Sequence, residues 1–314
     1  MATTNVTRRP LGRTGLEVFP LCLGGNVFGW TADQEDSFAV LDAYVAAGGN
    51  FIDTANGYSR WVPGHDGGES ERTIGDWLSA RGNRDELVIA TKLGSDGGLA
   101  PENVRARAEE SLERLKTDYV DILYAHYDDP DTPIEVSLQA FDELVREGKV
   151  RHLAASNFTA ERLEESIAIA EREGLVVYEV LQPQYNLLER DFEGALLDVA
   201  KRHDLAVAPY YGLAKGFLTG KYRPGHAVDS PRAAQVTDYQ SDRGWAVLDA
   251  VEEVADAHGV PAGAVALAWL AAQPTVVSPI ASARNSEQLT ELLPFVDLEL
   301  SEEELQRLTD AGAS

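Results

Sequence analysis

The sequence is poor in cysteine and in positive charge, and both shortages exclude classes of site. Cys22 is the single cysteine among 314 residues, so the chain can form no internal disulfide and no cluster of thiolate metal ligands. No metal site is expected, and Cys22, within the apolar run Val18 to Leu23, is expected to be buried. Lys and Arg number 27 against 52 Asp and Glu, a net charge of −25, which opposes binding to nucleic acid or to an anionic membrane.

Long apolar runs are missing too. No stretch approaches the roughly 20 apolar residues that span a bilayer, and Met1 to Pro10 lack the apolar centre of a secretory signal. We therefore expect a cytoplasmic protein without a membrane partner. The hydrophobic fraction of 44% allows a large core. Because a closed α/β barrel uses about 250 residues for one core, we expect a single domain over residues 1–314, with residues 1–8 as a loose N-terminal segment.

Short apolar or β-branched runs alternate with amphipathic stretches along the chain. Helical patterns include Glu102 to Leu115 and Glu161 to Glu171, the second preceded by the capping residue Thr159. Eight βα units in succession, with strands buried on both faces, indicate an α/β protein of the (β/α)8 TIM barrel type. The expected strands are Val18 to Gly25, Asn50 to Ala55, Leu87 to Lys92, Val120 to His126, Val150 to Ser156, Glu179 to Tyr185, Leu205 to Tyr210 and Val276 to Ala281.

Two segments interrupt this alternation. Arg9 to Val18 contains the turn Gly12 to Gly15 between short extended pieces, which predicts an N-terminal β-hairpin that plugs the N-terminal end of the barrel. Gly212 to Arg243 is rich in glycine, proline and charge, which predicts an insertion on the active-site face.

Four side chains that can donate, accept or tune a proton fall at the ends of neighbouring expected strands. Asp53, Lys92 and His126 lie at the ends of the second, third and fourth strands, and Tyr58 follows Asp53 in a loop. The C-terminal strand ends of such a barrel form the active-site rim. Each side chain taken alone also fits a structural role, as a cap, a packing residue or a core histidine, but their joint placement indicates a proton-handling site.

Lys92 is the most informative of the four, because a lysine that closes an apolar strand costs free energy unless it is paired. Asp53 is its expected partner. A tyrosine, with an ordinary pKa of about 10, is a poor acid at neutral pH. We therefore expect the Lys92 cation to lower the pKa of Tyr58, and His126 to hydrogen-bond the substrate oxygen.

Motifs over nearly the whole chain resemble those of the aldo-keto reductase family. They include Leu23-Gly24-Gly25, Asn50 to Tyr58, Gly68-Glu69-Ser70-Glu71, Ala90-Thr91-Lys92, Asp118 to Leu123 before His126, Ser156-Asn157-Phe158, Gln182 with Tyr185-Asn186, and Gly216 to Lys221. The resemblance implies a (β/α)8 barrel that reversibly reduces an aldehyde or ketone with NADPH, or alternatively NADH. It also implies Asp53, Tyr58, Lys92 and His126 as catalytic residues, with Tyr58 as the general acid.

The resemblance also implies residues that hold the nicotinamide. Ser156, Asn157 and Gln182 match the positions whose side chains hold the carboxamide, and Tyr210 matches the aromatic residue that stacks on the ring.

Other matching positions belong to the phosphates of the cofactor. Leu213 to Lys221 matches the loop around the pyrophosphate, and Arg284 with Gln288 matches the pocket of the adenosine 2′-phosphate. The full set of expected cofactor-binding residues is Gly25, Asn26, Asp53, Ser156, Asn157, Gln182, Tyr210, Tyr211, Gly212, Leu213, Lys215, Gly216, Lys221, Arg232, Ser282, Arg284 and Gln288.

NADPH is itself polyanionic, so an acidic chain must concentrate cations where it binds. Lys215, Lys221, Arg232 and Arg284 are the expected local patch, with ordinary surface charges as the alternative interpretation.

The chain departs from the family pattern at three places near the expected cofactor site. Tyr211-Gly212 stands where relatives commonly have Ser-Pro, Ser282 where glycine is frequent, and Leu292 where an asparagine often contacts the adenine. These departures imply altered contacts to phosphate and adenine, so NADPH preference rests chiefly on Arg284.

The substrate, a small-molecule carbonyl or alcohol, is expected to meet aromatic side chains. The loop Ser59 to Gly67 is longer than in minimal members of the family. The expected pocket residues are Asn26, Phe28, Trp30, Trp61 and Tyr127, with packing as the alternative role of the aromatics. No residue pattern predicts an oligomeric state.

Two other functions fit the same fold. A Schiff-base lyase would use Lys92 as nucleophile, but Asp53 would keep that lysine charged. A cofactor-binding regulatory or sensor protein would retain the fold without turnover, which the intact set of four residues disfavours.

Overall fold

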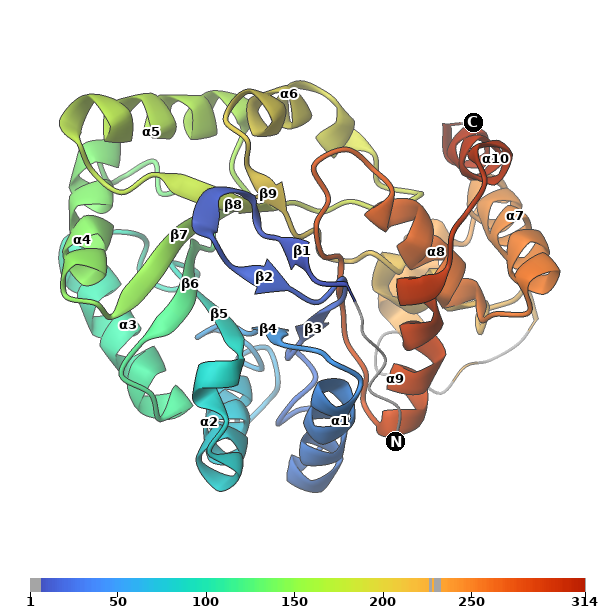
Figure 1. The fold of residues 1–314 in the computed structure, drawn as a ribbon, viewed down its shortest axis with the longest axis horizontal. Coiled ribbons are helices and arrows are strands. Elements are labelled where there is room, and N and C mark those ends of the chain that lie inside the picture. Colours follow the sequence, from blue (N-terminus) through green and yellow to red (C-terminus); the bar gives the residue numbers. More distant parts are fainter. Residues whose placement is uncertain (1–6, 226–227, 229–232, 314) are drawn as a thin grey trace.

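The computed structural model describes residues 7–225, 228 and 233–313 (Figure 1). Within them, eight parallel strands are ordered β10-β3-β4-β5-β6-β7-β8-β9. The strands are β3 (Cys22–Gly24), β4 (Phe51–Asp53), β5 (Val88–Leu93), β6 (Val120–Ala125), β7 (Val150–Ser156), β8 (Tyr178–Gln182), β9 (Ala206–Val207) and β10 (Ile280–Ala281). A parallel bridge between Val207 and Val276 joins β9 to the segment before β10, and this seam closes the sheet. The expected (β/α)8 barrel is confirmed.

Helices surround the sheet (Figure 1). They are α1 (Gln34–Ala46), α2 (Glu69–Arg81), α3 (Pro101–Leu115), α4 (Ile134–Arg146), α5 (Ala160–Glu173), α6 (Ala195–Arg202), α7 (Asp242–His258), α8 (Ala262–Ala271), α9 (Ser286–Leu292) and α10 (Glu302–Ala313). The Thr159 side chain accepts a hydrogen bond from the Arg162 backbone N–H at the start of α5, as capping requires. The two helices expected from the sequence, α3 and α5, are thus present within two residues of their predicted ends.

The N-terminal hairpin crosses one end of the barrel (Figure 1). Its strands β1 (Arg9–Pro10) and β2 (Glu17–Val18) pair antiparallel, and Leu11 and Val18 are buried in the cluster inside the barrel. The expected plug is therefore present. The run Val18 to Gly25, expected as one strand, is divided between β2 and β3, because Pro20 between them has no N–H to donate to a ladder.

The expected insertion follows β9. It contains two 3-10 segments, Ala214–Thr219 and Ala233–Tyr239, before α7 begins at Asp242. Arg232 lies outside the described residues. α7 packs on α8 and α10 beside the barrel (Figure 1).

In the described part of the chain, no single helix is long and apolar enough to cross a membrane. The pair α7 and α8, bent by 100°, passes that test jointly on length and composition alone.

Candidate active site

Strand alternation decides which side chains enter the barrel. Successive residues of a strand point to opposite faces, and Val88 and Ala90 of β5 lie in the inner cluster. Lys92 continues that series at the end of β5. In the same way, the inward residue Phe51 stands two positions before Asp53 on β4. Tyr124, also in the inner cluster, stands two positions before His126, which follows β6. Three neighbouring strands therefore deliver their last inward side chains to the same end of the barrel.

The Lys92 ammonium is the centre of the resulting cluster. It is fully buried, and its Nζ lies 2.6 Å from Asp53 Oδ2. The same Nζ donates to the Thr54 carbonyl oxygen at 2.8 Å and to Tyr58 Oη at 2.9 Å. Three acceptors match the three protons of an ammonium. The expected pairing of Lys92 with Asp53 is confirmed.

Asp53 is held from a second side. Gln182 at the end of β8 donates its Nε2–H to Asp53 Oδ1 at 2.9 Å, and Tyr58 Oη lies 3.3 Å from Asp53 Oδ2. A buried carboxylate with these partners is fixed in position.

The pKa of Tyr58 shifts in the direction opposite to the expected one. Burial raises it well above its ordinary value, and the neighbouring Asp53 carboxylate raises it further. The expectation that Lys92 lowers this pKa was wrong, because it neglected the cost of burying a phenolate beside a carboxylate. The phenol is therefore protonated at neutral pH, which is the form that donates a proton.

The pKa values of the neighbouring basic groups, Lys92 and His126, are lowered. Burial lowers the pKa of Lys92, although Asp53 opposes that shift. Burial, with the Lys92 cation as a second cause, lowers the pKa of His126 to about 3. The His126 ring lies 6.3 Å from the Tyr58 ring between centroids, and its buried Nδ1 has no hydrogen-bond partner among the described residues. His126 is therefore a neutral imidazole beside the phenol.

This assignment predicts a pH effect. A histidine in the unfolded chain titrates at about 6.5, whereas His126 in the folded protein titrates at about 3. Between these values the unfolded state binds more protons, so the folded state loses stability as the pH falls through this window. We expect a His126→Gln variant to lack this part of the pH dependence in urea titrations. An imidazole NMR signal that shifts near pH 6.5 in the folded wild type and is missing in the variant would contradict the assignment.

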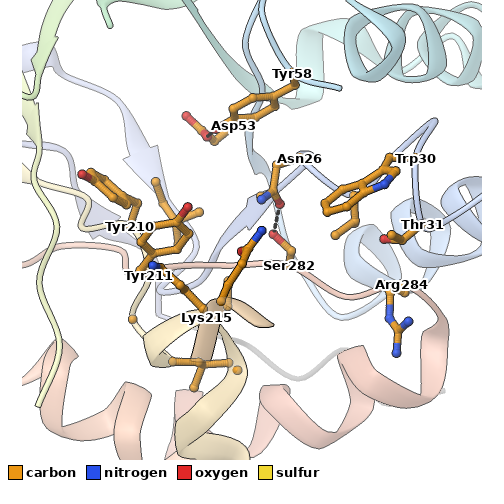
Figure 2. A pocket seen from close by; sticks show the side chains of 18 of the residues that line it. Asn26, Trp30, Thr31, Asp53, Tyr58, Tyr210, Tyr211, Lys215, Ser282 and Arg284 are labelled. Carbon is orange, nitrogen blue, oxygen red and sulfur yellow. Dashed lines mark hydrogen bonds between the residues drawn. The ribbon is translucent and has the colours of Figure 1, made fainter. Parts of the chain in front are cut away.

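A cavity of about 1040 Å³ opens beside this cluster. Figure 2 shows Tyr58 and Asp53 on one wall and Arg284 at a distance from them, with Asn26 and Ser282 between. Of the residues predicted from the sequence, those that line the cavity are Asn26, Trp30, Asp53, Tyr58, Trp61, His126, Tyr127, Ser156, Asn157, Gln182, Tyr210, Tyr211, Gly212, Leu213, Lys215, Gly216, Lys221, Ser282, Arg284 and Gln288.

Of the predicted residues that the structure describes, three do not line this cavity. Lys92 lies behind Asp53 and Tyr58 and contacts both. Phe28 is fully buried in the core, where it packs instead of facing a substrate. A Cβ at Gly25 would lie 2.8 Å from Ser70 Oγ and 3.1 Å from the Asp53 carbonyl oxygen, so the glycine allows a close backbone approach.

Side-chain hydrogen bonds join the strand ends near Tyr58. Asn157, just after β7, has a left-handed φ of 58°. It donates to the His126 carbonyl oxygen at 2.8 Å and accepts from the Tyr210 hydroxyl at 2.8 Å. Ser156 Oγ donates to the Gln182 carbonyl oxygen at 2.9 Å. These bonds fix the polar side chains at this part of the cavity wall.

The insertion supplies the next stretch of the cavity wall. Tyr211, Ala214 and Lys215 all have left-handed backbone conformations, with φ of 56°, 47° and 58°, which cost non-glycine residues free energy. Lys215 Nζ lies 5.4 Å from the centre of the Tyr211 ring. Strain concentrated beside a cavity is a common feature of ligand-binding loops.

The three departures noted in the sequence all face this cavity. Ser282 Oγ donates to Asn26 Oδ1 at 2.6 Å (Figure 2), a bond that glycine could not make. Leu292 presents a buried apolar side chain. Tyr211 contributes an aromatic surface next to Lys215.

Other cavity residues were missed from the sequence, among them Thr31, Arg60, Ser95, Gln235 and Glu291. Arg60 belongs to the loop Ser59 to Gly67, so the length of that loop was a usable signal. The other four follow no motif, and their position depends on how the loops fold.

Comparison with known proteins agrees with this geometry. The family model described as "Aldo/keto reductase family" matches residues 20–313. Norsolorinic acid reductase stcV of Emericella nidulans is 34% identical, over 94% of this chain and 79% of the relative. The uncharacterized oxidoreductase YrpG of Bacillus subtilis is 35% identical, over 96% of this chain and 94% of the relative. Aldo-keto reductase ausK of Emericella nidulans is 33% identical, over 95% of this chain and 79% of the relative.

The match covers every strand of the barrel and each element that carries the cluster around Lys92. The chain therefore belongs to the aldo/keto reductase family and is an NAD(P)H-dependent oxidoreductase that acts on carbonyl compounds.

Proposed function

We propose that this protein reduces an aldehyde or ketone to an alcohol with NADPH, reversibly, and that Tyr58 is the general acid. One observation carries the proposal: the Tyr58 hydroxyl lies at the cavity wall and accepts a hydrogen bond from the buried Lys92 ammonium, which Asp53 holds.

The four residues divide the proton transfer between them. Tyr58 donates its proton to the substrate oxygen as negative charge develops there. Lys92 then stabilises the phenolate through the hydrogen bond it already makes to Tyr58 Oη. Asp53 keeps Lys92 in place. The neutral His126 hydrogen-bonds the same substrate oxygen and selects the pose in which the carbonyl meets Tyr58.

The size and lining of the cavity support a nicotinamide dinucleotide as the cofactor. The bound cofactor supplies the hydride. Ser156, Asn157 and Gln182 would hold the carboxamide, and Tyr210 would stack on the ring.

The cations support a phosphorylated cofactor. Neither Lys215 nor Arg284 forms an ion pair with a carboxylate of the described residues, although most arginines of the chain are paired with acidic side chains, as Arg84 is with Asp121. Lys215, with Lys221 nearby on the wall, would contact the pyrophosphate. Arg284 would contact the 2′-phosphate that distinguishes NADPH from NADH.

The geometry opposes a Schiff-base role for Lys92. A nucleophilic amine must be uncharged and must reach the substrate. The Lys92 Nζ donates to three oxygens and is fully buried behind Tyr58.

Arg284→Ala tests the cofactor assignment. We expect KM for NADPH to rise about 10- to 100-fold, because a charge-assisted hydrogen bond to phosphate is lost. KM for NADH should change less than about 3-fold, because NADH has no 2′-phosphate for Arg284 to contact. Initial rates with a panel of carbonyl compounds measure both. Arg172→Ala, which removes an exposed arginine paired with Glu173, is the charge-matched control. Equal rises for NADPH and NADH would contradict the role of Arg284.

A further inference from the structure

Glu71 is a fully buried carboxylate in the first turn of α2, and it does not line the cavity. Its Oε1 accepts a hydrogen bond from the Thr91 hydroxyl at 2.6 Å, and its Oε2 accepts from Arg114 Nε at 2.6 Å. Replacing a buried ion pair by apolar residues is often neutral or stabilising, because removing charges from water costs free energy. Stability alone therefore does not explain why a carboxylate stands here.

Thr91 connects Glu71 to the cluster around Lys92. It stands between Ala90 and Lys92 on β5. Because successive strand residues point to opposite faces, its side chain points away from the barrel interior, toward α2. The Glu71–Thr91 hydrogen bond therefore holds β5 from outside, at the residue next to the lysine that donates to Tyr58 Oη inside. A displacement of Thr91 would move Lys92 as well.

Ser70, the residue before Glu71, makes the same kind of connection to the end of β4. Its Oγ donates to the Gly25 carbonyl oxygen at 2.7 Å and lies 2.7 Å from Thr54 Oγ1. The Thr54 carbonyl oxygen is one of the three acceptors of the Lys92 ammonium. Two successive side chains of α2 thus hold the ends of β4 and β5, the strands that carry Asp53 and Lys92.

Arg114 of α3 fixes the Glu71 carboxylate from the other side. Gly68, just before α2, leaves room for this arginine. Its φ of 80° is left-handed, and a Cβ there would lie 2.6 Å from Arg114 Cδ. The motif Gly68 to Glu71 therefore serves an ion pair that lies outside the cavity.

The charge of Glu71 also acts on Lys92. Burial lowers the pKa of Lys92, and the carboxylates of Asp53 and Glu71 both oppose this shift. A protonated Lys92 is the form that can stabilise a phenolate at Tyr58. Glu71 therefore favours the same form of Lys92 that Asp53 favours, from the opposite side of β5.

We infer that Glu71 is a positioning residue for carbonyl reduction, which holds β5 at Thr91 so that the Lys92 ammonium stays on Tyr58 Oη. This inference rests on the proposed function, because it concerns the proton that Tyr58 transfers. It gives the motif Gly68 to Glu71 a role that requires no contact with cofactor or substrate.

Two variants remove the two contributions of Glu71 separately. Thr91→Val loses the hydroxyl that Glu71 holds, so we expect kcat to fall about 10-fold while KM for NADPH changes less than about 3-fold. Thr91→Ser, which restores the hydroxyl, should recover most of kcat. Glu71→Gln keeps an acceptor for Thr91 but loses the charge, so Lys92 should lose its proton at lower pH. We expect the ratio of kcat at about pH 9 to kcat at about pH 7 to fall about 3-fold relative to the wild type.

Asp121→Asn is the matched control. Asp121 is a second buried carboxylate that bonds β5 from outside the cavity, at the Ile89 N–H, and it pairs with Arg84. Its loss should lower the free energy of unfolding but keep the wild-type kcat and pH ratio. A wild-type kcat in Thr91→Val, together with a wild-type pH ratio in Glu71→Gln, would overturn the inference.

A measurement without turnover separates this inference from the proposed function. NMR of isotope-labelled lysine side chains follows the titration of Lys92 Nζ, whose signal is identified by its absence in Lys92→Arg. We expect this signal to titrate at lower pH in Glu71→Gln than in the wild type. If the wild type reduces no carbonyl compound but the signal shifts in this way, the proposed function fails and the action of Glu71 on Lys92 stands. If Tyr58→Phe abolishes reduction but Glu71→Gln and Thr91→Val keep the wild-type titration and kcat, the proposed function stands and the role of Glu71 fails.

Discussion

Replacing Tyr58 with phenylalanine is expected to lower kcat for carbonyl reduction by about 100- to 10,000-fold, the contribution of a positioned general acid. The substitution removes only the hydroxyl that accepts from Lys92, and the ring can keep its contacts with Trp61 and His126. NADPH should therefore bind Tyr58→Phe with an affinity within about 3-fold of the wild type, because the missing hydroxyl stabilises the transition state and not the bound cofactor. Single-turnover rates and fluorescence titration with NADPH measure the two quantities.

The matched control for this variant is Tyr119→Phe. Tyr119 precedes β6 at the opposite end of the strand from His126, and its hydroxyl donates to Asp85 outside the cavity. Its removal should leave kcat unchanged. Full turnover by Tyr58→Phe with cofactor still bound would mean that another group donates the proton.

Replacing Lys92 with methionine is expected to destabilise the fold by about 3–5 kcal/mol, the cost of removing one partner of a buried ion pair. The reason is that Asp53 remains buried with its carboxylate facing an apolar side chain. Urea unfolding followed by circular dichroism measures the loss. Activity should disappear as well, because Tyr58 loses the cation that stabilises its phenolate.

Two further variants isolate the charge effect. The double variant Asp53→Asn with Lys92→Met carries no unpaired buried charge, so we expect it to regain much of the stability lost in Lys92→Met. Arg202 forms an exposed ion pair with Glu164. We expect the Arg202→Ala variant, which breaks this pair, to lower the free energy of unfolding by less than about 1 kcal/mol. A Lys92→Met protein as stable as Arg202→Ala would show that the ion pair does not constrain the folded state.

The cluster around Lys92 could be predicted from the sequence because strand alternation is itself a sequence property. The apolar residues Val88 and Ala90 mark the inner face of β5 four and two residues before Lys92, so the direction of that side chain follows from counting. The plug was predictable for a similar reason, since its turn residues stand between two short extended pieces. The division of β2 from β3 at Pro20 was missed, and β9 and β10 are shorter than the runs expected for them.

Other features depend on tertiary contacts and have no local signal. Tyr211, Ala214 and Lys215 adopt left-handed conformations that their residue types disfavour, so no propensity predicts the shape of that wall. The raised pKa of Tyr58 comes from burial beside Asp53. The degree of burial depends on the folded barrel and cannot be read from the neighbouring residues along the chain. Phe28 was expected among the aromatic side chains that meet the substrate, whereas its side chain packs into the core.

The pairing of β3 with β10 has a consequence for the order in which this protein folds. Cys22 pairs with Ile280 in register, so the barrel closes only after nearly the whole chain is available. The Ser282–Asn26 hydrogen bond spans 256 positions next to the same pair of strands, and loop-closure entropy makes such distant contacts slow to form. During synthesis the edge of β3 next to β10 therefore stays unpaired until β10 has been made, and the cavity wall at Asn26 and Ser282 is completed in the same step as the barrel.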